Sequence, residues 1–173
     1  MESNQKYAQH QWQILTKRPE RIIQCLPGDW GDGWDNVWLG VSVESQQYLH
    51  RAHTLAKIPA KTRFISAEPL LGEIDLKQLG SELDMFHWCI IGGESGNDTG
   101  KYRYRECRQE WIEKIIDDLR DTNIAVFVKQ TGTYLAKQMG CKDRHGGDID
   151  EWPEHLRIRE FPAVVMKVEK LVY

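Results

Sequence analysis

Five short apolar segments, each ending in polar or charged residues, constrain the fold of this chain more than any other feature. They lie at residues 13–18, 37–44, 63–69, 87–95 and 125–132. Stretches with helical periodicity separate most of them, and parallel strands need such crossovers because consecutive strands point the same way. We therefore predict an α/β fold, either a partial (β/α) barrel or an open, mainly parallel sheet of about five strands with helical crossovers.

The length of the chain suits one domain. Its 173 residues can bury a substantial core, so a single α/β domain over residues 1–173 is expected. Residues 1–141 would form the βα units. Residues 142–173 would form a charged, turn-rich tail, in which 164–172 can be a final strand or an extended segment over a sheet edge.

The segments between the expected strands differ in how clearly they predict a helix. Residues 45–58 and 106–121 carry apolar side chains at helical spacing, so each is expected to pack one face against the sheet. Pro19 favours the start of a helix directly after the first strand. Residues 75–84 show no clear apolar stripe, and we expect a short irregular crossover there.

Composition argues against several classes of protein. No run of eighteen apolar residues is present, so no membrane partner is expected, and the polar start of the chain does not resemble a signal peptide. These features predict a cytoplasmic protein. A net charge of −3 gives no broad footprint for nucleic acid. The cysteines lack the short spacing of zinc or iron–sulfur motifs, so no metal site is expected; they are Cys25, Cys89, Cys107 and Cys141.

Polar residues follow the apolar segments at positions that parallel strands would bring to one edge of the sheet, where α/β proteins place their chemistry. These candidate ligand-binding residues are Lys17, Arg18, Glu44, Glu68, Glu94, Ser95, Lys129 and Gln130. Such a set can bind a polar ligand, hold a divalent metal or transfer protons. The structural alternative is that opposite charges only pair around the edge. We favour a ligand site, because charges at inner strand ends are costly to bury without a use or a good partner.

A glycine-rich turn and a basic segment follow the fourth apolar segment. Residues 92–96 hold three glycines, which let the backbone approach a ligand and expose N–H groups to an anion. In residues 101–108, cations alternate with two tyrosines. Lys101, Arg103 and Arg105 are the candidate nucleic-acid contacts, because cations bind phosphates and aromatic rings stack on bases. A solvated helix entry is the alternative interpretation.

Six motifs in fixed order resemble a known family. They occupy residues 15–19, 39–44, 68–72, 92–96, 127–130 and 146–162. In these motifs the chain resembles an uncharacterised phage and prophage protein family, the gp-thirty-seven/gp-sixty-eight proteins, which is itself similar to radical-SAM partial barrels. Full-length members of that family begin earlier, with a cysteine cluster motif and the first barrel strands, and this chain lacks that part.

The resemblance implies a function. The chain would be the C-terminal part of a phage-type radical-SAM-like barrel protein, binding a polar ligand or cofactor at the strand ends without an iron–sulfur site of its own. S-adenosylmethionine is the cofactor that the resemblance suggests, and whether the chain is an enzyme stays open. The alternatives are a non-catalytic phage-encoded binding or interaction protein and a nucleic-acid-binding module.

The first strand of such a partial sheet would be an exposed edge with apolar faces, which favours pairing with another chain. We therefore expect an N-terminal partner chain or a homo-oligomer.

Overall fold

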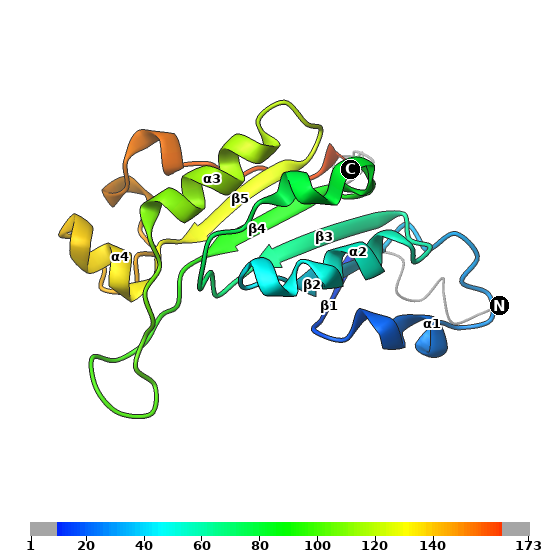
Figure 1. Ribbon diagram of the computed structural model, residues 1–173, viewed down its shortest axis with the longest axis horizontal. Helices are drawn as coiled ribbons and strands as arrows, with labels where there is room; N and C mark the ends of the chain where they lie inside the picture. The colour runs from blue at the N-terminus through cyan, green and yellow to red at the C-terminus, as the bar shows by residue number, and fades with distance from the viewer. Residues whose placement is uncertain (1–9, 164–173) are drawn as a thin grey trace, which may run out of the picture.

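The computed structural model describes residues 10–163, in which five strands form one parallel sheet (Figure 1). The strands are β1 (Trp12–Thr16), β2 (Val37–Ser42), β3 (Thr62–Ala67), β4 (Trp88–Gly92) and β5 (Ala125–Gln130). Each strand pairs with the next in the chain, so the spatial order is β1-β2-β3-β4-β5. The predicted α/β fold with a parallel sheet and helical crossovers is confirmed.

Helical segments follow each strand in turn. The α-helices are α1 (Ile22–Cys25), α2 (His50–Ala56), α3 (Gln109–Leu119) and α4 (Gly132–Met139). The 3₁₀ helices are η2 (Pro19–Arg21), η3 (Gln46–Tyr48), η4 (Leu76–Met85), η5 (Ile149–Glu151) and η6 (Glu154–Leu156). Between residues 10 and 163, no helix has the length and apolar character that crossing a membrane requires.

The predicted helices lie at the expected places in the chain, but their bounds differ from the prediction. Residues 45–58 hold η3 and α2, and α3 begins only at Gln109, because Arg108 before it is extended. The expected irregular crossover at 75–84 consists of 3₁₀ turns that break at Gly80, where φ is +56°. The sequence pattern did not single out α4.

The two faces of the sheet are covered differently. The helices α2, η4 and α3 lie together on one face (Figure 1), above the larger apolar core, in which Val41, Ile65 and Ile91 are fully buried. Because side chains alternate between faces along a strand, the residues next to them point to the second face. That face carries a smaller cluster of Trp38, Phe64 and Trp88.

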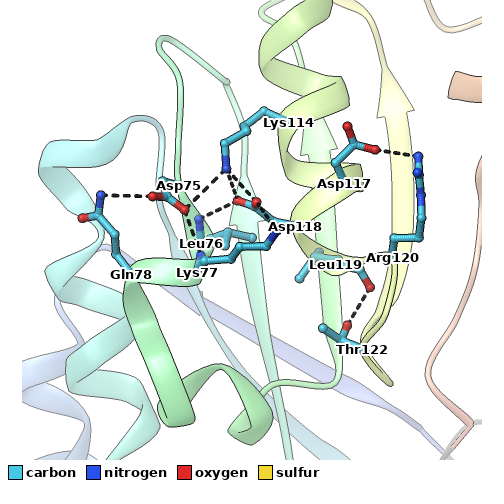
Figure 2. A network of polar contacts seen from close by, with 10 residues as sticks. All are labelled: Asp75, Leu76, Lys77, Gln78, Lys114, Asp117, Asp118, Leu119, Arg120 and Thr122. Carbon is cyan, nitrogen blue, oxygen red and sulfur yellow. Dashed lines mark hydrogen bonds and ion pairs between the residues drawn. The ribbon is translucent and has the colours of Figure 1, made fainter.

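A buried carboxylate fixes the crossover η4 against α3. Asp118 of α3 accepts hydrogen bonds from the Leu76 backbone N–H at 2.9 Å and from Lys114 Nζ at 2.6 and 2.7 Å (Figure 2). Lys114 also reaches Asp75, at 3.4 Å. Burial alone would lower the pKa of Lys114, but its hydrogen bonds to Asp118 and the charges of both carboxylates outweigh that effect and raise the pKa. These hydrogen bonds therefore fix the start of η4, a crossover without a long α-helix, against α3.

The tail covers the β5 edge of the sheet. The Val128 N–H donates to the Ile158 carbonyl at 2.8 Å, and the Glu160 N–H donates to the Val126 carbonyl at 2.8 Å. Phe127 and Arg159 pair antiparallel between these two bonds. The part of the tail expected as a possible final strand, 164–172, lies outside the described residues.

Candidate functional site

The sequence-predicted residues follow the carboxyl ends of neighbouring strands, at the end of the sheet to which the arrowheads point in Figure 1. Lys17 and Arg18 follow β1, Glu44 follows β2 and Glu68 follows β3. The others come from the next two strands: Glu94 and Ser95 follow β4, and Lys129 and Gln130 end β5. The contacts of these side chains show which of them act together.

Glu44 holds the ends of β1 and β2 together. Its side chain is 6% exposed and forms ion pairs with Lys17 Nζ and, at 2.8 Å, with Arg51 Nη1 of α2. Arg51 also donates to the Ser42 carbonyl at 2.9 Å and lies over the Tyr48 ring, 4.1 Å from its centroid. Burial alone would raise the pKa of Glu44, but the hydrogen bond from Lys17 and the two positive charges bring it below its usual value. Glu44 is therefore ionised at neutral pH.

Glu68 and Lys129 meet across the intervening strand. Glu68 Oε1 and Lys129 Nζ are 2.7 Å apart although they come from β3 and β5. Between them lies Gly92 of β4, where a Cβ atom would stand only 3.1 Å from the Glu68 carboxylate. Strands two places apart are about 9–10 Å from each other, so the ion pair spans that gap over a position without a side chain.

Glu94 belongs to a third pair, which closes the base of the following loop. It accepts hydrogen bonds from the Arg105 backbone N–H at 2.9 Å and from the Arg105 guanidinium at 2.8 and 2.6 Å. These bonds lower the pKa of Glu94 and raise that of Arg105. Arg105, a candidate nucleic-acid contact, thus has a carboxylate partner inside the chain.

The remaining strand-end residues are arranged more loosely. Gln130 Nε2 donates to the Gly93 carbonyl at 2.8 Å and to Ser95 Oγ at 3.0 Å, which links the ends of β4 and β5. Arg18 is exposed, and its guanidinium has no ion-pair partner between residues 10 and 163. The candidate set thus forms three ion-pair groups, around Glu44, between Glu68 and Lys129, and around Glu94. Gln130 adds hydrogen bonds between the ends of β4 and β5, and Arg18 takes part in none of these contacts among the described residues.

The arrangement presents cations to solvent, while their carboxylate partners are largely covered. The side chains of Lys17, Lys129 and Arg105 are 59%, 52% and 59% exposed, whereas their carboxylate partners are 6%, 23% and 24% exposed. The strand residues before these ends that point to the second face are small and buried, namely Gly40, Ser42, Ser66 and Gly92. Such a surface can accept an anionic group on its cations, and the fixed carboxylates can accept a cationic group.

The other candidate nucleic-acid residues lie elsewhere. Lys101 and Arg103 are exposed in the loop between β4 and α3, which projects from the carboxyl end of the sheet (Figure 1). They take no part in the ion pairs at the strand ends.

Sequence reasoning missed Arg51 as part of the site. Arg51 stands seven residues after Glu44, within the segment 45–58 that was expected to be helical. A cation about two helical turns after a strand-end carboxylate can face back to it, and this spacing was the signal in the sequence. The buried thiols of Cys89 and Cys107 have pKa values raised to about 12 by burial, so both stay protonated. Over residues 10–163, no three His, Cys, Asp or Glu side chains gather as a metal site.

Comparison with known proteins places the chain in a family. No curated protein matches it, and no solved structure matches it. A family model described as "Protein of unknown function (DUF5131)" matches residues 1–162, which is most of the chain. This chain therefore belongs to the DUF5131 family.

Proposed function

We propose that the carboxyl ends of the strands bind a small polar ligand or cofactor with both an anionic and a cationic group. The observation that supports this most is the Glu68–Lys129 ion pair over Gly92. The ammonium group is half exposed and the carboxylate is largely covered, so a ligand anion can approach Lys129 while Glu68 stays in place. A ligand ammonium can then occupy the position on Glu68 that Lys129 leaves.

S-adenosylmethionine is the first candidate ligand, because its methionine part carries an ammonium and a carboxylate. Its choice rests on the resemblance of six motifs to radical-SAM-like barrels. On this proposal the chain is the C-terminal part of a phage-type radical-SAM-like barrel protein, and the cysteine ligands of an iron–sulfur cluster would come from a partner chain, because the four cysteines here lack the cluster spacing. The alternative is a phage-encoded binding protein that keeps the pocket without the chemistry.

Thermal unfolding with and without millimolar S-adenosylmethionine tests the proposal. A ligand at 100 times its dissociation constant stabilises the folded chain by about 2.7 kcal/mol. We expect Lys129→Ala to abolish this stabilisation while the apo chain unfolds as the wild type does. Methionine and adenosine, added separately, show which half of the ligand is recognised.

Arg120→Ala is the matched control. It removes an ion pair with Asp117 on α3, at 2.6 Å, in which both side chains are exposed, and it touches no strand-end residue. The control variant should respond to ligand as the wild type does. The absence of any shift with the wild type, or an equal shift with Lys129→Ala, would exclude the strand ends as the binding site.

A further inference from the structure

The loop between β4 and α3 has a defined shape although it projects from the sheet (Figure 1). The Asn97 N–H donates to the Tyr102 carbonyl at 2.7 Å, and the Tyr104 N–H donates to the Asn97 carbonyl at 3.3 Å. These bonds fold residues 97–104 into a tight turn. The Glu94–Arg105 contacts close its base.

Side chains from α4 and the tail hold the sides of this loop. Asp98 accepts hydrogen bonds from Lys137 of α4 and, at 3.0 Å, from the Tyr104 hydroxyl. Arg144 donates to the Gly96 carbonyl at 3.2 Å and to Asn97 Oδ1 at 3.4 Å. The loop is thereby fixed in position, so a partner that binds at its tip need not order it first.

The charges of the loop do not balance at its tip. Both acidic side chains of residues 94–105 are neutralised, Glu94 by Arg105 and Asp98 by Lys137. Lys101, Arg103 and Arg144 have no carboxylate within ion-pair distance among residues 10–163. A locally positive surface therefore projects from a chain whose net charge is −3.

An exposed aromatic ring lies next to Lys101. Tyr102 is 70% exposed, and the Lys101 ammonium lies 5.6 Å from its ring centroid. An exposed tyrosine at a loop tip gains no burial energy within the fold. A ring flanked by cations is the arrangement with which proteins stack on an unpaired base and neutralise the adjoining phosphates.

We propose that residues 96–105 bind single-stranded nucleic acid, with the Tyr102 ring stacked on a base and Lys101, Arg103 and Arg144 on phosphates. A single strand suits this surface better than a duplex, because only unstacked bases offer a face to the ring. Lys101, Tyr102, Arg103 and Arg144 take no part in the Glu68–Lys129 ion pair.

Fluorescence anisotropy with a labelled oligothymidine of about 12 nucleotides tests the proposal on the full chain. At low salt we expect a dissociation constant of about 1–100 µM, and weaker binding as salt rises. Tyr102→Ala should weaken binding by roughly tenfold, and Tyr102→Phe should leave it within about twofold, because the phenylalanine ring still stacks.

The cations are tested by charge-matched double variants. Lys101→Ala with Arg103→Ala should weaken binding and reduce the slope of log K against log salt by about 1.4, since each phosphate contact on a single strand contributes about 0.7. Arg21→Ala with Lys61→Ala removes two exposed cations that also lack ion pairs within residues 10–163, and it should leave the slope unchanged. All these side chains are exposed, so the melting temperatures should match the wild type.

Three results would overturn the proposal. The first is no binding by the wild type at low salt. The second is equal loss in both double variants, which would indicate a general charge effect. The third is displacement of the oligonucleotide by polyglutamate at equal charge concentration together with normal binding by Tyr102→Ala, which would assign the loop to acidic polypeptides.

Discussion

At one edge of the sheet, residues 158–160 run antiparallel to β5 and supply backbone partners for Val126 and Val128. At the other edge, β1 is the last strand of the described sheet. The apolar side chains of the two edge strands also differ in burial. Val126 and Val128 are buried, whereas Ile14 and Leu15 of β1 are 51% and 48% exposed, on opposite faces of the strand.

The two edges of the sheet therefore differ in how the described residues cover them. The β5 edge is satisfied from within the chain, and Phe161 extends the cover by packing against Trp88 and Phe127, at 5.5 and 5.3 Å between ring centroids. An uncovered parallel edge with apolar residues on both faces is a template for another strand. We therefore expect the β1 edge to associate with an N-terminal partner chain or with a second copy.

The largest contrast between the edges should come from two leucines. Leu156 lies in the tail beside β5 and is fully buried, so Leu156→Ala should cost about 2–5 kcal/mol of unfolding free energy. Leu15→Ala at the β1 edge should cost less than about 1 kcal/mol, because half of its surface is already in water. Urea unfolding of both variants gives the comparison, and similar losses would show that β1 is as well covered as β5.

A smaller effect is expected from Glu44, which attaches the end of β1 to β2 through Lys17. Glu44→Gln keeps the size of the side chain but weakens both ion pairs, and should cost about 1–3 kcal/mol at pH 7. The pKa of Glu44 is lowered on folding, so its stabilisation is present above its unfolded pKa and is lost as pH falls through the folded pKa.

The pH dependence separates the charge of Glu44 from its packing. Wild type and Glu44→Gln should differ in unfolding free energy at pH 7 and converge as the pH falls through the lowered pKa of the folded Glu44 carboxyl. Chemical unfolding at several pH values measures this convergence. A constant difference from pH 7 to pH 3 would show that shape and not charge accounts for the loss.

Much of the fold could be predicted because the strands are local apolar runs. The α4 helix could not, since it spans only Gly132–Met139, begins at a glycine with φ of +80° and has no side-chain cap at its start. Helices this short depend on tertiary packing rather than on their own propensity. The sequence therefore marked the strands but not every element between them.

The place of the candidate site in the fold could be predicted from the sequence, but most of the contacts between its side chains could not. Parallel strands must bring their ends to one edge, which is why Glu44, Glu68 and Lys129 could be named together. The Glu94–Arg105 pair depends on how an intervening loop closes, and the sequence assigned these two residues to different roles. Arg51 was missed because its contact with Glu44 requires α2 to fold back on β2.

The smallest effect on stability, and the clearest on assembly, is expected from a charge placed at the β1 edge. Leu15→Lys should change the unfolding free energy of the monomer by about 0.5 kcal/mol or less, since a half-exposed lysine keeps its ammonium in water. If β1 pairs with a second copy, sedimentation of the wild type should show a mass that rises with concentration, and Leu15→Lys should remain monomeric. Phe161→Lys places the same charge on an exposed apolar residue at the covered edge and should leave the association intact. A wild type that stays monomeric at every concentration would exclude self-pairing at the β1 edge.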